Sequence, residues 1–125
     1  MNKKIIQTDL APEAVGTYSQ GVEYNGVLYF SGQIGLDPKT MELKESFEEQ
    51  TEQILKNIDG LLESQGLTRE NIIKTSIFLT DLAKFGSVNQ AYIDYFKEPY
   101  PARSCVQVPA LPKGALIEIE VIAAR

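Results

Sequence analysis

The chain contains no histidine among its 125 residues. Histidine is the usual side chain for proton transfer near neutral pH and a common metal ligand. Its absence excludes catalysis of the Ser-His-Asp and Cys-His types and removes most zinc and iron sites. Any chemistry must therefore use carboxylates, arginine, lysine, tyrosine, serine, cysteine or the backbone.

Cysteine and long apolar runs are scarce as well. Cys105 is the single cysteine, so the chain cannot form an internal disulfide. No stretch approaches the ~20 apolar residues that span a membrane, and the first seven residues lack the apolar run of a signal peptide. We therefore expect no membrane contact and a location in the reducing cytoplasm.

Positive charge is in deficit, with 12 lysine and arginine residues against 17 acidic residues and a net charge of -5. Nucleic acids and anionic membranes bind clustered positive surfaces, so this balance argues against both as partners. It does not exclude a small anion, because one arginine can hold a carboxylate. The composition is 43% hydrophobic and 23% charged, which is typical of a globular chain, and we expect one domain over residues 1–125.

The sequence pattern predicts six strands and two helices. The expected strands cover residues 3–7, 18–24, 27–31, 71–79, 102–108 and 115–124. Asn25-Gly26 between the second and third strands is a strong signal for a hairpin turn. Ser46 with Glu49 and Ser87 with Gln90 match the capping box that begins a helix.

The predicted order is therefore β-β-β-α-β-α-β-β. Strand-helix-strand units favour parallel pairing with right-handed crossovers, which would place both helices on one face of a mixed sheet. The predicted fold class is a two-layer α+β domain.

The last two strands suggest that the other face of the sheet has a function. Apolar residues at 117, 119, 121 and 123 share one face, which suits packing on helices. We assign Arg103, Cys105, Glu118 and Glu120 to the opposite face. The same layer is expected to hold Ile72 and Phe78, or Val27 and Tyr29. A half-solvated sheet face is the ordinary interpretation of such a mixture. The alternative is that other copies of the chain cover this face and leave ionisable residues around an interfacial cleft.

Several short motifs occur in a fixed order along nearly the whole chain. They are residues 16–21 (GTYSQG), 30–34 (FSGQI), 88–89 (VN) with Tyr92, 101–106 (PARSCV), 111–113 (LPK) and 117–120 (IEIE). In this combination the sequence resembles the Rid (YjgF-like) family of imine deaminases. One departure is Thr17, where the family often has proline.

The resemblance implies a chorismate-mutase-like fold and a homotrimer whose sheets form a central barrel, with clefts between subunits. The implied activity is hydrolysis of 2-imino acids such as 2-iminobutanoate and 2-iminopropanoate, and of their enamine tautomers, to 2-keto acids and ammonia. Such reactive imines leak from pyridoxal-phosphate dehydratases, so the implied role is control of metabolite damage. No metal or cofactor is implied.

The resemblance also assigns roles to particular residues. By this resemblance Arg103 matches the family's arginine that binds the substrate carboxylate. Glu118 matches the glutamate that positions or activates water. Cys105 is similar to a wall residue of the cleft. The remaining lining residues by this resemblance are Tyr18, Ser31, Gly32 and Asn89.

Each role has an alternative that the residues alone leave open. Arg103 could form a structural salt bridge with Glu118 or Glu120, and these glutamates could be ordinary solvated carboxylates. Cys105 could be a nucleophile, although no histidine activates it and lone cysteines in strands are mostly packing residues.

Two functions of other classes also remain open. One is RNA cleavage or inhibition of translation, which the acidic composition opposes. The other is a non-catalytic trimer that binds small acids or acts like a chaperone.

Overall fold

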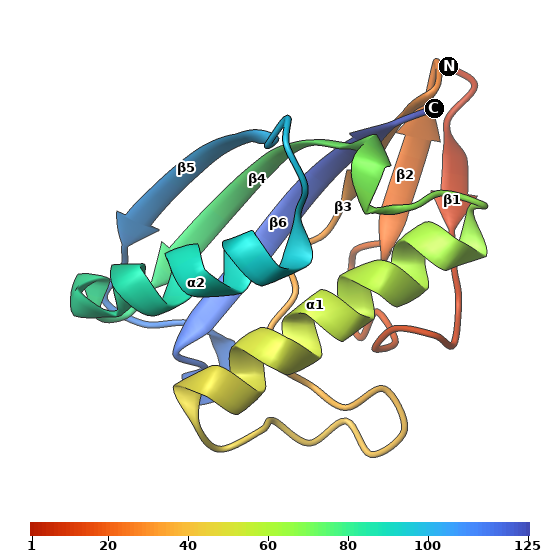
Figure 1. Cartoon of the computed structure of the whole chain (residues 1–125). Coiled ribbons are helices and arrows are strands. Elements are labelled where there is room, and N and C mark those ends of the chain that lie inside the picture. Colours follow the sequence, from red (N-terminus) through yellow and green to blue (C-terminus); the bar gives the residue numbers. More distant parts are fainter.

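Two helices lie across one face of a six-stranded sheet in the computed structural model, which describes all of residues 1–125 (Figure 1). The strands are β1 (Lys4–Ile6), β2 (Gly21–Tyr24), β3 (Val27–Phe30), β4 (Ile72–Leu79), β5 (Ala102–Gln107) and β6 (Ile117–Ala124). The helices are α1 (Phe47–Ser64) and α2 (Phe85–Tyr95), with short 3₁₀ turns at η1 (Arg69–Asn71), η2 (Leu82–Lys84) and η3 (Pro112–Gly114). Both the α+β class and the predicted element order are confirmed.

The strands are arranged in the order β1-β2-β3-β6-β4-β5. The pair β4 and β5 is parallel, as predicted for the unit β4-α2-β5, and all other neighbours are antiparallel. β3 and β4 also run in the same direction, but β6 lies between them. The strand β6 is therefore central, whereas β5 forms an edge of the sheet.

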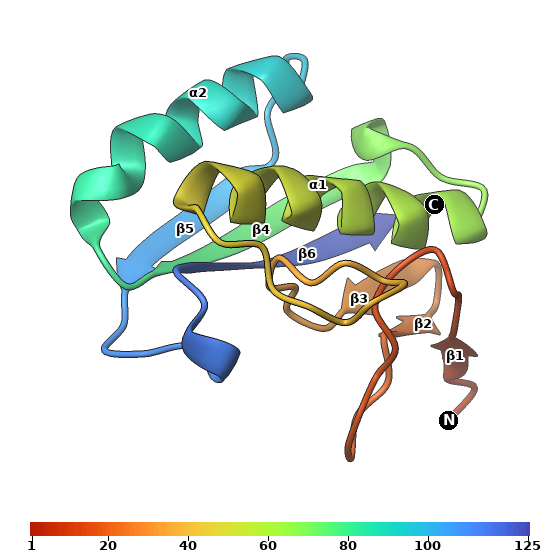
Figure 2. The same ribbon diagram turned by 90° about the horizontal axis from the view of Figure 1, so that it is seen from below.

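The core lies between the sheet and the helices. Figure 2 shows α1 and α2 on the same side of the sheet, which we call the helix face; the opposite side is the outer face. The β6 residues Ile117, Ile119, Val121 and Ala123 are all buried, which confirms the predicted helix-facing stripe. α1 begins with the predicted capping box, in which the Glu49 amide donates to Ser46 Oγ at 3.1 Å.

The predicted start of the second helix is wrong. α2 begins at Phe85, so Ser87 lies inside the helix and the proposed capping box of Ser87 with Gln90 does not form. The cap belongs instead to Asp81, whose carboxylate accepts a hydrogen bond from the Ala83 amide at 3.0 Å. That bond begins the turn η2, which leads directly into α2.

The second strand is shorter than predicted, because it begins at Gly21 and leaves Tyr18 in the preceding loop. Gln20 explains the boundary: its side-chain amide donates to the carbonyls of Thr8 and Pro12, each at 2.8 Å, and thereby holds the loop. The predicted hairpin is confirmed, since Asn25 and Gly26 have φ angles of 51° and 79°. No helix in the chain is both long and apolar enough to cross a membrane.

Candidate functional site

Arg103 and Cys105 point to the helix face of the sheet. In the parallel pairing of β4 with β5, Arg103 lies beside Thr75 and Cys105 beside Ile77, and both β4 residues are buried under the helices. The prediction that Arg103 and Cys105 share the outer face with Glu118 and Glu120 is therefore wrong. Alternation along a strand fixes which residues share a face but not which face that is. β5 is an edge strand with no fully buried residue, so its hydrophobic pattern does not indicate which of its two sides faces the helices.

Ile72 is also on the helix face, contrary to one prediction. It pairs with buried Ala123, and a register shift between Ile72 and Lys74 reverses the alternation at that point. Phe78 and Tyr29 lie on the outer face as predicted, because they pair with Glu118 and Ile122. Glu120 pairs with Ser76 on the same face.

The guanidinium of Arg103 is held by three residues of α2. Its Nη1 donates to Asn89 Oδ1 at 2.6 Å. Its Cζ lies 4.9 Å from the ring centre of Phe85 and 5.3 Å from that of Tyr92. Helical spacing places residues 85, 89 and 92 on one face of α2, so a single helix face supports the arginine. The structure thus brings together two predicted site residues, Arg103 and Asn89.

Arg103 has no carboxylate partner within the chain. The other two arginines each form an ion pair, Arg69 with Asp59 at 2.8 Å and Arg125 with Glu23 at 2.9 Å. The suggested salt bridge of Arg103 to Glu118 or Glu120 is therefore absent. Apart from the bond to Asn89, its N–H groups have no partner in the chain, so they can bind an anion. A cavity of about 570 Å³ adjoins the guanidinium. It is lined by Asn89, Tyr92, Ile93, Tyr100, Pro101 and Arg103.

Cys105 is half-buried and packs against the hydrophobic core. Burial raises the pKa of its thiol, and the positive charge of nearby Arg103 opposes this effect only in part. A raised pKa leaves little thiolate near neutral pH, which is the reactive form. These features favour packing over nucleophilic catalysis for Cys105.

Glu118 lies on the outer face of β6 with no hydrogen bond or ion pair to its carboxylate from within the chain. Burial raises its pKa, and the negative charge of Glu120 raises it further. The backbone of Gly32 passes directly against this side chain. A Cβ at residue 32 would lie 2.9 Å from Cδ of Glu118 and closer still to Oε2, so only glycine fits without movement.

Ser31 connects the Glu118 region to the loop that carries Tyr18. Its hydroxyl donates to the Ser19 carbonyl at 2.6 Å, and its amide donates to the Gln20 carbonyl at 2.9 Å. Tyr18, which precedes Ser19, remains 55% exposed. The predicted lining residues Tyr18, Ser31 and Gly32 therefore belong to the same part of the molecule as Glu118.

The predicted site residues thus form two groups. The arginine cluster consists of Arg103, Asn89 and Cys105 on the helix face. The glutamate cluster consists of Glu118, Gly32 and Ser31, and the Ser31 hydroxyl bonds to Ser19 in the loop that carries Tyr18. Phe85 and Tyr92 were missed as neighbours of Arg103, although their helical spacing from Asn89 could have indicated them.

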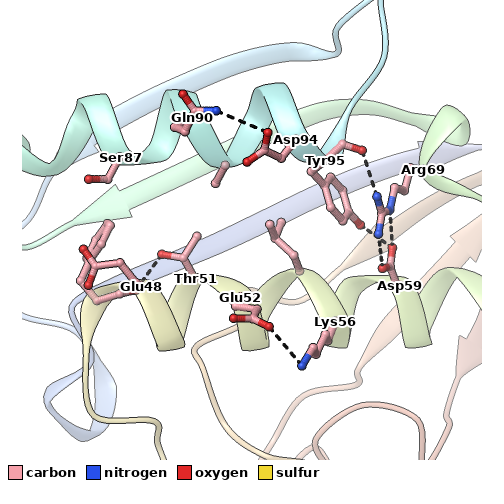
Figure 3. Close-up of a pocket in the computed structure, with 13 residues that line it drawn as sticks. Glu48, Thr51, Glu52, Lys56, Asp59, Arg69, Ser87, Gln90, Asp94 and Tyr95 are labelled. Atoms are coloured by element: carbon pink, nitrogen blue, oxygen red, sulfur yellow. Dashed lines mark hydrogen bonds and ion pairs between the residues drawn. The ribbon is translucent and has the colours of Figure 1, made fainter.

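A separate groove of about 530 Å³ lies between α1 and α2 and contains none of the predicted site residues (Figure 3). At one end Arg69 donates to both carboxylate oxygens of Asp59, at 3.0 and 2.8 Å, and the Tyr95 hydroxyl donates to Asp59 at 2.7 Å. This network joins the two helices. No group of three histidine, cysteine, aspartate or glutamate side chains is arranged to hold a metal ion.

Comparison with known proteins identifies relatives along the full chain. The family model described as endoribonuclease L-PSP matches residues 8–125. A RutC family protein of Aquifex aeolicus is 52% identical over 122 residues, which cover 96% of this chain and 98% of the relative. Reactive Intermediate Deaminase A of Arabidopsis thaliana, a chloroplastic protein, is 47% identical, with 98% of this chain and 66% of the relative covered. The 2-iminobutanoate/2-iminopropanoate deaminase of Mus musculus is 43% identical, with 98% and 92% covered.

Solved structures agree with these relatives. The Rid family protein YyfA of Yersinia pestis superimposes with a TM-score of 0.95 at 53% identity, over 98% of this chain and 99% of that one. RidA of Psychrobacter sp. PAMC 21119 gives 0.95 at 48% identity, with the same coverage of 98% and 99%. TdcF of E. coli, solved with bound serine, gives 0.92 at 42% identity over 98% of each chain. On this evidence the chain belongs to the Rid family, also described as the endoribonuclease L-PSP family.

Proposed function

We propose that the protein is a deaminase that hydrolyses 2-imino acids, such as 2-iminobutanoate and 2-iminopropanoate, to 2-keto acids and ammonia. This proposal rests on the guanidinium of Arg103, which is held in place but has no carboxylate partner. Arg103 is the one arginine without an ion-pair partner, and three residues of α2 hold it in place. Relatives at 43% and 47% identity that are called deaminases support the same activity.

Arg103 recognises the carboxylate that every 2-imino acid carries. A guanidinium offers two parallel N–H donors that match the two oxygens of a carboxylate, so it fixes the orientation of the substrate as well as its presence. Nη1 of Arg103 donates one hydrogen bond to Asn89, and the other N–H groups of the guanidinium remain free to bind the substrate carboxylate. The imine carbon, one bond from the carboxylate, is then held at a defined position.

Glu118 positions the water that attacks this carbon and accepts a proton from it. Its raised pKa makes the carboxylate a better proton acceptor than an ordinary glutamate. Glu118 takes a proton from water as the oxygen bonds to the imine carbon, and it passes this proton to the imine nitrogen. In the resulting carbinolamine Glu118 takes the hydroxyl proton and transfers it to the amino nitrogen, so the carbon–nitrogen bond breaks, ammonia leaves and the hydroxyl oxygen becomes the keto oxygen. Water and imino acid are thus converted to ammonia and keto acid with no other reactant.

A single chain does not bring Arg103 and Glu118 to one substrate, because the two clusters lie on opposite faces of the sheet. The proposal therefore includes a homotrimer in which the arginine cluster of one copy meets the glutamate cluster of the next. Exposed apolar residues on the outer face, among them Tyr29 and Val106, favour such an assembly. Light scattering coupled to gel filtration is expected to give about three chains per particle.

The activity is tested by coupling a threonine dehydratase to the protein and following release of 2-ketobutanoate. The enzyme reaction supplies fresh 2-iminobutanoate, and the protein is expected to accelerate its hydrolysis above the spontaneous rate. Arg103→Ala and Glu118→Gln serve as controls that should return the rate to the spontaneous level. A folded oligomer that leaves the spontaneous rate unchanged would refute the proposal and leave a non-catalytic binding protein as the alternative.

RNA cleavage is the second candidate, because the matching family model is described as an endoribonuclease. The chain has no histidine, a net charge of -5 and no group of side chains arranged to hold a metal. These features oppose phosphate binding and cleavage. RNA cleavage that co-elutes with the oligomer and disappears in both Arg103→Ala and Glu118→Gln would favour this candidate over deamination.

A further inference from the structure

Tyr92 lies buried directly beneath Arg103, and the chemistry proposed above gives it no role. Its side chain is 6% exposed, and its ring packs against Phe96 at 5.0 Å between ring centres. Its hydroxyl donates a hydrogen bond to Oγ1 of Thr75, which is 1% exposed. The same ring lies 5.3 Å from the guanidinium carbon of Arg103.

Burying the hydroxyls of Tyr92 and Thr75 costs more free energy than burying apolar side chains that only fill the core. Two buried hydroxyls lose their hydration, and their mutual hydrogen bond compensates for this loss with little net gain. Phenylalanine and valine would fill similar space without that cost. Burial raises the pKa of Tyr92 to about 12, so the hydroxyl keeps its proton and remains a donor. The pair therefore fixes the position of the ring rather than adding to core packing.

The location of Thr75 explains what the fixed ring achieves. Thr75 is the direct neighbour of Arg103 in the pairing of β4 with β5. The Tyr92 ring is thus anchored to the strand next to the one that carries Arg103, so the ring and the backbone of Arg103 keep one geometry. Phe85 contacts the guanidinium from the same helix at 4.9 Å, and Asn89 binds Nη1. An arginine on an exposed edge strand would otherwise sample many rotamers.

We propose that Tyr92 is a positioning residue, which orients the guanidinium of Arg103 for a carboxylate through a ring anchored to Thr75. The consequence for catalysis rests on the proposed function, whereas the ordering of Arg103 does not. A loosened guanidinium still attracts an anion, but it presents the imine carbon to the water less accurately.

Two variants remove the anchor from either end, Tyr92→Phe and Thr75→Val. Each is expected to lower kcat for 2-iminobutanoate about three- to tenfold, which corresponds to the loss of one hydrogen bond. Binding of the product 2-ketobutanoate should weaken by less than this. The matched control is Tyr95→Phe, which removes a buried hydroxyl from the same helix, where its partner is Asp59 rather than a residue near Arg103. The control should keep the wild-type kcat.

A double-mutant cycle separates positioning from general destabilisation. In the Arg103→Lys background, Tyr92→Phe should lower kcat by much less than in the wild type, because the guanidinium that it orients is gone. An equal loss in both backgrounds would show that Tyr92 acts independently of Arg103 and would overturn the proposal.

A readout independent of activity uses the fact that the chain has only three arginines, at 69, 103 and 125. In ¹⁵N NMR each Nε–H gives its own signal, and its order parameter reports how rigidly the guanidinium is held. Tyr92→Phe and Thr75→Val should lower the order parameter of Arg103 Nε and leave those of Arg69 and Arg125 unchanged. Unchanged order at Arg103 in both variants would overturn the proposal. If the wild type shows no deaminase activity, the proposed function fails, while this measurement still decides whether Tyr92 orders Arg103.

Discussion

Arg103 and Glu118 lie on opposite faces of one sheet, on strands that are separated by β4. Arg103 is level with buried Thr75 on the helix face, whereas Glu118 is level with Phe78 on the outer face. A substrate with only a few carbon atoms cannot contact both side chains of one chain. A mechanism that uses both therefore requires a second copy of the protein.

Arg103→Lys is expected to lower turnover of 2-iminopropanoate on the order of a hundredfold, because lysine keeps the charge but loses the two-pronged planar donor. Binding of the keto-acid product should weaken less than turnover, since electrostatic attraction survives. The two quantities are measured by steady-state kinetics and by calorimetric titration on both proteins. Turnover near the wild-type rate would reduce Arg103 to a general electrostatic role.

Glu118→Gln is expected to lower kcat by about a hundredfold or more, because the amide cannot accept a proton. Product binding should remain measurable, which would place the loss on the chemical step. A rate like that of the wild type would exclude Glu118 as the proton acceptor and direct attention to Glu120.

The same variant is expected to gain stability at neutral pH. The folded-state pKa of Glu118 is raised by burial and by Glu120, so the folded chain holds a proton that the unfolded chain has already released. The protonated form of Glu118 stabilises the folded state fully below the ordinary glutamate pKa of about 4.3. This stabilisation is lost as pH rises through the raised pKa. The Tm of Glu118→Gln should therefore exceed that of the wild type by more at about pH 8 than at about pH 4. A constant difference in Tm across this range would contradict the raised pKa.

Gly32→Ala is expected to abolish most activity while the chain still folds, because the added methyl group displaces the carboxylate of Glu118. Gly86→Ala is the matched control, since a Cβ there meets no atom within 4 Å and the residue lies in α2. That control should keep its activity and gain up to about 1 kcal/mol of stability from helix propensity. Equal activity in the two variants would show that the contact between Gly32 and Glu118 has no catalytic importance.

Cys105→Ala is expected to fold and to keep most of the wild-type turnover. The thiol has a raised pKa and packs against the core, so its removal should cost stability, by about 1 kcal/mol, rather than chemistry. Turnover and thermal unfolding of the variant check both statements. Complete loss of turnover in a well-folded variant, or a trapped thiol adduct, would make Cys105 a nucleophile.

The sequence predicted the fold well where burial leaves a periodic signal. The alternation of β6 and the capping box at Ser46 are local patterns, and both are present in the structure. The face of β5 was not predictable in this way, since an edge strand with both sides accessible has no apolar stripe. Ile72 was misplaced because a bulge reverses the alternation, and no residue type marks that bulge.

The strand pattern singled out Arg103, Cys105 and Glu118, and the family resemblance added the other candidate residues and the roles. The division into two clusters came only from the structure. Strand pairing decides which faces Arg103 and Glu118 occupy, and pairing involves residues far apart in the sequence. Contacts of this kind have no signature in a local window of residues. The packing of Gly32 against Glu118 is another example, because the two are close only when β6 lies beside the segment after β3.

A complete site, in our proposal, combines Arg103 of one copy with Glu118 of another, and mixing two inactive variants tests this pairing. Arg103→Ala and Glu118→Gln are each expected to be inactive in the dehydratase-coupled assay. When the two variants are co-expressed and purified as mixed trimers, each trimer contains one interface at which Arg103 of one copy and Glu118 of the next are both intact. Such mixed oligomers should recover a substantial fraction of wild-type turnover. Mixed oligomers as inactive as either variant alone would contradict a site shared between copies, because Arg103 and Glu118 would then have to act from the same chain or not together at all.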